Sequence, residues 1–154
     1  MRPSILWVLL GGLLMSSASH ALSPEATEGK ALYPSCDVCH DQAKVPALGP
    51  PMWGVARKYK MNTMDKEDFI QQMTRFVKAP SLETAIHTEA LSQLGLMPAM
   101  PLPDDFLNKI SAYIFEEDFA PPCDHWRFAI DKAKKAGNVQ HAAKDQRQLD
   151  RFCQ

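Results

Sequence analysis

Two cysteines three positions apart, with a histidine directly after the second, are the residues of this chain best suited to do chemistry. They are Cys36, Cys39 and His40, in the stretch PSCDVCH that begins at Pro34. Residues of these types at this spacing bind zinc, form redox-active dithiols, or attach a haem covalently. Each of the three chemistries requires different residues elsewhere in the chain.

The zinc and dithiol interpretations lack those residues. Structural zinc needs four ligands, usually in two closely spaced pairs, and the second pair would have to come from Cys123 and His125. A thioredoxin-type dithiol follows a strand in a βαβ unit, and the sequence has no alternation of apolar and polar residues long enough for such a strand. We therefore disfavour both.

The first 21 residues have the pattern of a secretory signal peptide. A positive charge at Arg2 precedes an apolar run over 5–15, and small residues lead to Ala21. The apolar run is too short for a membrane span. We expect cleavage after Ala21, a periplasmic location, and no stable membrane span in the remaining chain. In an oxidising compartment the four cysteines then need bonding partners.

The composition of residues 22–154 predicts one compact domain with a small extension. Residues 22–122 carry 9 basic and 14 acidic side chains, whereas 123–154 carry 7 and 4. The net charge of the whole chain is −1, which does not favour nucleic acid as a partner. The oligomeric state is open.

Apolar residues recur at helical spacing along most of the chain. Helices are expected in five segments of the body, over 24–33, 52–60, 64–78, 82–91 and 104–117. Pro and Gly interrupt the chain over 41–51 and 95–103, which predicts loops there. Asp124 and the Gly137-Asn138 pair then delimit two more helices, over 125–136 and 139–153, as a hairpin.

Two further stretches accompany the CxxCH motif in order: LGPPMWGVARKY and GLMPAMPLPDDFLNKISAYI. With GKALYPSCDVCHD they resemble the successive landmarks of class I monohaem cytochromes c, over roughly residues 24–118. The resemblance implies an all-α, cytochrome c-like fold around one covalent haem c. It also implies that the first and last helices of the body cross near Gly29, against Ile110 and Tyr113.

The resemblance assigns roles to the motif residues. Cys36 and Cys39 are the thioether anchors of the haem and His40 is one axial ligand of its iron. The second axial ligand is a methionine before the last helix of the body, for which Met97 is preferred over Met100. Bis-histidine ligation through His87 is a weaker alternative.

Three residues are expected around the haem. The carbonyl of Pro50 matches the family position that accepts a hydrogen bond from the proximal histidine, although Pro51 leaves the register uncertain by one. Trp53 and Tyr59 are expected to line the haem pocket, and as large aromatics they suit the general core equally well.

The extension departs from the plain family pattern. A disulfide between Cys123 and Cys153 would close it and contribute about 3–4 kcal/mol in the chain-entropy model. We thus expect a signal peptide over 1–21, a cytochrome c domain over 22–118 and a disulfide-closed helical extension over 119–154. The basic extension either braces the body or docks an acidic partner.

The expected function is one-electron transfer between redox partner proteins, without enzymatic activity, since two axial ligands leave no open position on the iron. The alternatives are a cytochrome subunit of a periplasmic oxidoreductase complex and, less favoured, a haem catalyst or gas-binding protein.

Overall fold

The protein is all-α over residues 21–154, the part of the chain that the computed structural model describes. The expected signal peptide therefore lies outside the described residues, except for Ala21. The eight described helices are α1 (Pro24–Leu32), α2 (Pro34–His40), α3 (Met52–Asn62), α4 (Lys66–Lys78), α5 (Thr88–Leu94), α6 (Asp104–Glu116), α7 (Cys123–Lys135) and α8 (Val139–Phe152). None of the helices described is both long and apolar enough to cross a bilayer.

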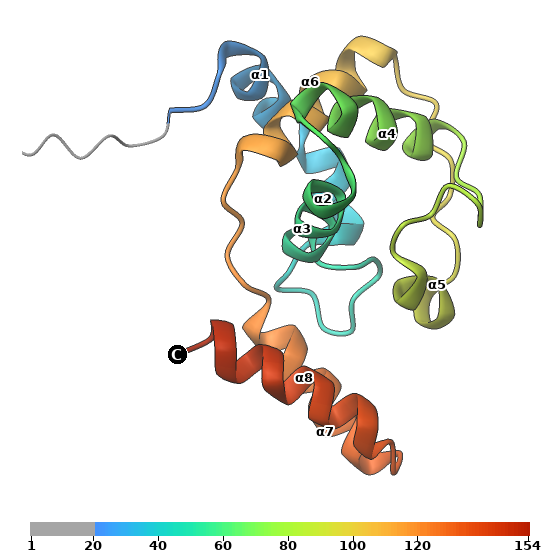
Figure 1. Cartoon of the computed structure of the whole chain (residues 1–154), viewed down its shortest axis with the longest axis vertical. Helices are drawn as coiled ribbons and strands as arrows, with labels where there is room; N and C mark the ends of the chain where they lie inside the picture. Colours follow the sequence, from blue (N-terminus) through green and yellow to red (C-terminus); the bar gives the residue numbers. More distant parts are fainter. Residues whose placement is uncertain (1–20) are drawn as a thin grey trace, which may run out of the picture.

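Helices α1 to α6 form a body, and α7 and α8 lie side by side as a hairpin beyond it (Figure 1). An extended segment over 117–122 joins the two parts. The close helix pairs of the described chain all lie within the body or within the hairpin. The hairpin therefore meets the body through side chains.

The crossing of α1 and α6 closes the body. A Cβ added at Gly29 would lie 1.9 Å from the carbonyl oxygen of Lys109 and 3.0 Å from the amide nitrogen of Ile110. Only a residue without a side chain permits this backbone contact. The expected crossing near Gly29 is thus confirmed.

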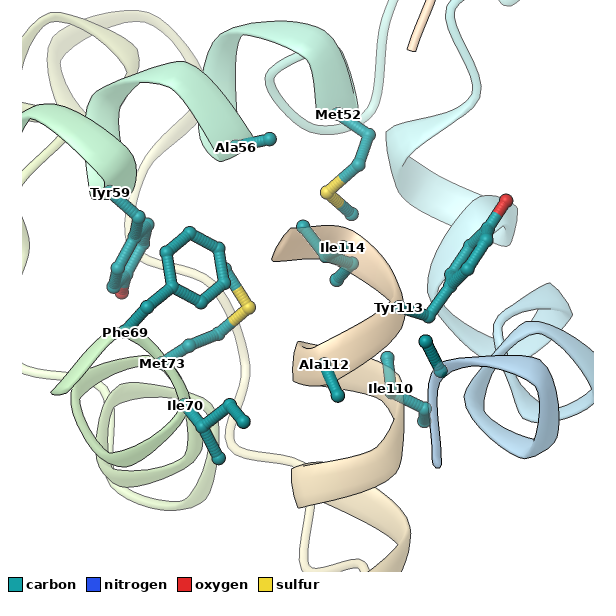
Figure 2. Packing of buried hydrophobic residues seen from close by; sticks show 11 residues of the cluster. Met52, Ala56, Tyr59, Phe69, Ile70, Met73, Ile110, Ala112, Tyr113 and Ile114 are labelled. Carbon is teal, nitrogen blue, oxygen red and sulfur yellow. The ribbon is translucent and has the colours of Figure 1, made fainter. Parts of the chain in front are cut away.

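The core of the body is built mainly by α3, α4 and α6, and it includes Ala26 of α1. Figure 2 shows side chains of α3 and α4 converging with those of α6, and the ring of Phe69, fully buried, contacts that of Tyr59 at 5.6 Å between centroids. These apolar side chains recur three or four positions apart, so each helix buries one face. The labelled members are Met52, Ala56, Tyr59, Phe69, Ile70, Met73, Ile110, Ala112, Tyr113 and Ile114.

Glu116 fastens the end of this core. Its carboxylate accepts hydrogen bonds from the backbone N–H and the hydroxyl of Ser23, both at 2.7 Å, and pairs with Lys66 Nζ at 2.7 Å. One side chain therefore joins the starts of α1 and α4 to the end of α6.

The hairpin has its own small core. Trp126, Ile130 and Ala133 of α7 and Ala142 of α8 are buried, and none of them belongs to the cluster inside the body. Cys123 and Cys153 form a disulfide across its open end, as expected. The covalent bond compensates for a core too small to hold two helices by apolar burial alone.

The prediction of a helix over 82–91 was wrong for its first residues, because α5 begins only at Thr88. The hydroxyls of Ser81 and Thr84 bond to one another at 2.9 Å, and Ser81 Oγ accepts the backbone N–H of Thr84. Side-chain bonds of this kind hold a turn where the apolar spacing suggested a helix. Helix α2, which carries the CxxCH motif, had not been expected.

Candidate functional site

A cavity of about 410 Å³ opens within the body and is the candidate site. Its wall includes residues of α2 to α6 and of the loops over 46–51 and 95–103. No Asp, Glu, Lys or Arg is among the described lining residues. The volume and the apolar wall are typical of sites that hold a small molecule or cofactor.

The cavity explains why two apolar residues of α4 are not fully buried. Phe76 and Val77 of α4 are only half-buried, and both line the cavity. Their exposed surface is thus turned to this hollow and not to bulk solvent.

His40 is the last residue of α2, and a hydrogen bond with a backbone carbonyl holds its ring in place. Its Nδ1 lies 2.7 Å from the carbonyl oxygen of Pro50. A carbonyl only accepts, so Nδ1 carries the proton, and in the neutral imidazole Nε2 is the unprotonated nitrogen that could bind a metal. Burial lowers the pKa of the His40 imidazole, against the hydrogen bond to Pro50, which raises it. The imidazole is therefore held neutral in one tautomer, and Pro50, not Pro51, occupies the expected position.

Gly49 leaves room for that imidazole. A Cβ at Gly49 would lie 3.1 Å from the carbonyl oxygen of Cys39 and 3.2 Å from two atoms of the His40 ring. A side chain there would press on the ring and on the backbone of the motif. Gly49 thus leaves space for the His40 ring, and Pro50 accepts the hydrogen bond of that ring.

The two thiols of the motif also line the cavity. Cys36 is half-buried and Cys39 exposed, and both are free. Three positions apart on α2, they lie on one face of the helix. Burial raises the pKa of the Cys36 thiol, which disfavours the thiolate that a redox dithiol requires.

The zinc interpretation loses its second ligand pair, because Cys123 is bonded to Cys153. Within residues 21–154, His, Cys, Asp and Glu do not gather in any group of three that could hold a metal ion. Among the described residues, the CxxCH motif therefore lacks the further ligands that a zinc site needs.

No family model, curated protein or solved structure matches this chain.

Both candidate methionines reach the same cavity as His40. Met97 and Met100 are half-buried and line it from the 95–103 loop. The backbone N–H of Met100 donates to the carbonyl of Val77 at 3.0 Å, which ties this part of the loop to α4. The preference for Met97 stays a prediction, since both residues line the cavity.

Of the expected pocket residues, Tyr59 lines the cavity but Trp53 does not. The Trp53 ring instead packs against Trp126 and Phe152 of the hairpin, with centroids 5.3 and 5.0 Å apart. Trp53 directly follows Met52, which is buried in the core, so its ring leaves α3 in another direction. Trp53 thus does not have the position that the resemblance implied, because its ring contacts the hairpin.

His87 precedes α5 and lines the cavity as well. Burial lowers the pKa of its imidazole, and the charge of Lys58 lowers it further. A Cβ added at Gly54 of α3 would lie 3.6 Å from its Nε2, so the ring packs against α3.

Sequence reasoning missed most of the apolar rim of the cavity. Val38, Leu48, Leu94 and Leu96 line it and remain strongly exposed. Exposed large apolar side chains close together indicate a binding surface. The only signal in the sequence was their position in or beside proline- and glycine-rich loops.

Proposed function

We propose that this protein is a monohaem c-type cytochrome that carries one electron at a time. The observation that supports this most is that two free thiols, a histidine fixed at Nδ1 and two methionines line one uncharged cavity. Thiols suit thioether bonds to a porphyrin edge, and imidazole and thioether suit the two axial positions of its iron.

The residues present fit this cofactor. The lining is free of charged side chains among the described residues, as a large apolar ring requires, and Nε2 of His40 is the nitrogen left for a metal. In this assignment Cys36 and Cys39 would hold the haem c, and His40 and Met97 would ligate its iron, with Met100 as the second choice. The haem supplies a reversible one-electron couple of its iron.

The remaining residues tune and protect that couple. The carbonyl of Pro50 orients His40 and makes its Nε2 more basic. The apolar side chains of α3, α4 and α6 exclude water from the cavity. If His40 and a methionine both ligated the iron, the haem would have no open position for a substrate, which favours a carrier over a catalyst.

The direct test is expression of the full chain in a periplasm that matures c-type cytochromes. We expect haem that stays with the polypeptide in acidified acetone, a mass increase of one haem, and loss of this attachment in C36S/C39S. Haem that acidified acetone removes, or none at all, would contradict the proposal.

Carbon monoxide binding distinguishes an electron carrier from a haem catalyst or gas-binding protein. A carrier with two side-chain ligands should bind carbon monoxide poorly in the reduced state, whereas a labile sixth ligand permits ready binding. Ready binding by the freshly reduced wild type would favour the catalyst.

A second candidate, a cytochrome subunit of a periplasmic oxidoreductase complex, is favoured by the hairpin. Seven basic side chains against four acidic ones lie in residues 123–154, and no described helix of this part packs closely on a helix of the body. Such a surface suits an acidic partner chain. Isolation from the native periplasm tests it, because a subunit is recovered with a second chain and a free carrier alone.

A further inference from the structure

A second hollow, a groove of about 1,010 Å³, separates the body from the hairpin. It is lined by residues of α3, α5, α7 and α8 and by Pro46 and Ala47. The groove exists because the segment over 117–122 carries the hairpin away from the body before α7 begins (Figure 1). Its volume lies at the upper end of the range for small-molecule sites, about 300–1,000 Å³.

Aromatic rings form the contact between the two sides of this groove. Trp53 of α3 lies edge-on to Trp126 and to Phe152, and the guanidinium of Arg57 lies 4.7 Å from the Trp53 ring centroid and 5.2 Å from that of Phe152. Apolar ring surface and a cation thus lie together where the two parts of the chain meet.

The charges that line the groove are mostly positive. Its two acids are already engaged, Glu89 with Lys144 and Asp145 with His141 at 3.1 Å. Among the described residues, no carboxylate lies within 4.0 Å of the charged nitrogens of the remaining basic residues, which are Arg57, Lys58, Lys132 and Arg151. The groove therefore presents four cations without a fixed counter-charge.

Imidazoles add hydrogen-bonding groups. The Nδ1 of His125 is buried and has no hydrogen-bond partner among the described residues, and His87 and His141 line the same groove.

We propose that this groove binds a small organic anion, a carboxylate carried on a flat apolar body. The four unpaired cations supply the attraction for the carboxylate, the imidazoles that line the groove supply hydrogen bonds, and the partly exposed rings of Trp53 and Phe152 supply a surface for the flat body.

The groove and the cavity share part of their walls. Pro50, His87, Ala90 and Leu94 line both. An anion in the groove therefore lies directly behind the proposed haem site. The proximity of the anion to a haem depends on the proposed function, whereas the binding of the anion in the groove does not.

The test uses 2-naphthoate as the probe and uncharged 2-naphthamide as the control ligand, titrated into the full-length mature protein. Binding is followed by calorimetry and by the shifts of the indole N–H signals of Trp53 and Trp126 in NMR spectra. We expect naphthoate to bind at least about tenfold more tightly than naphthamide, since a hydrogen bond to a charged group contributes about 1.5–3 kcal/mol.

The chain offers a matched pair of variants. Lys132 and Lys134 both lie on α7, but only Lys132 lines the groove. We expect K132Q to weaken naphthoate binding about three- to tenfold and K134Q to change it less than about twofold. R57Q should weaken it about tenfold or more, because Arg57 is next to the rings.

Three results would overturn the proposal: no binding of naphthoate, equal binding of the two probes, or equal losses in K132Q and K134Q. The first means that the groove is not a site, the second that it is only apolar, and the third that net charge alone attracts the anion. Unchanged melting temperatures of K132Q and K134Q separate loss of binding from loss of folding. All readouts are obtained whether or not a haem is attached, so failure of the proposed function is distinguishable.

Discussion

The indole of Trp53 lies edge-on to the indole of Trp126, with ring centroids 5.3 Å apart and an interplanar angle of 88°. Trp53 comes from the body and Trp126 from the hairpin, and no helix of one part packs closely on a helix of the other within the described chain. The relative position of the two parts therefore depends on a few side chains, this pair and the ion pair of Lys144 with Glu89 among them.

Replacing Trp53 by alanine should release the hairpin. We expect Trp53→Ala to lower the free energy of unfolding by about 2–4 kcal/mol, less than the loss of a fully buried tryptophan. Limited proteolysis should then cut more rapidly within 117–122. The control is Met64→Ala, since Met64 is 90% exposed and its truncation should leave both measurements unchanged. Equal proteolysis of wild type and Trp53→Ala would argue that other contacts hold the hairpin.

Gly29 and Gly54 provide a matched pair of helical glycines. A Cβ at Gly29 meets the backbone of Lys109 at 1.9 Å, which cannot move without separating α1 from α6, so Gly29→Ala should cost about 3 kcal/mol or more. A Cβ at Gly54 makes only an ordinary contact with His87 at 3.6 Å, and Gly54→Ala should be neutral or stabilise by about 0.5–1 kcal/mol. Urea denaturation measures both, and similar values for the two variants would refute the close crossing.

The sixth ligand is testable by absorption. In the ferric protein Met97→Ala should abolish the methionine-to-iron charge-transfer band, and Met100→Ala should leave it. The opposite outcome would make Met100 the ligand, and retention of the band in both variants would exclude each of them.

Acid should weaken the protein through Glu116. Burial alone would raise the pKa of this carboxyl, but hydrogen bonds from Lys66 and Ser23 outweigh it and hold the pKa at about 2, below the ordinary 4.5. Its stabilising contribution is thus complete above about pH 4.5 and is lost as the pH falls towards about 2. Urea midpoints of Glu116→Gln and wild type should therefore differ most near neutral pH and converge in acid.

The surface pair of Lys78 and Asp104 supplies the control for that measurement. Asp104 has a 66% exposed side chain, so Asp104→Asn should alter stability by less than about 1 kcal/mol at any pH. A pH profile of Glu116→Gln parallel to that of the wild type would show that other carboxyls govern the acid response.

The disulfide should stabilise the hairpin more than the body. Cys123 and Cys153 are separated by 30 residues, for which the chain-entropy model gives about 3–4 kcal/mol. In C123S/C153S we expect amide exchange to accelerate throughout α7 and α8 and little in α4 and α6. Uniform acceleration would mean that the two parts unfold together.

The helices were largely predictable because their residues carry the signal locally. The apolar spacing in α4 and α6, the acidic first turn of α4 and the proline at the start of α1 determined these elements. The start of α5 was not predictable in this way, since the hydroxyl bonds between Ser81 and Thr84 depend on the turn they hold.

The residues that the motifs singled out line one cavity, whereas the surroundings of that cavity were not predictable. The order of the CxxCH motif, the Gly-Pro pair and the Met-Pro loop carries the resemblance, and the fold brings these residues to one cavity. The direction of the Trp53 ring and the groove beside it arise from where the hairpin lies. No local pattern encodes that placement, because it depends on an extended segment and on contacts between distant residues.

The backbone contact between Gly29 and Lys109 joins the two ends of the body, and this affects the order of assembly. A contact between residues so distant in sequence closes a long loop, which is entropically costly and slow to form. We expect the body to remain open until α6 has emerged and met α1. Throughout that interval α6 has not yet closed the cavity that Cys36 and Cys39 line, so both thiols are more accessible to other molecules than in the finished body.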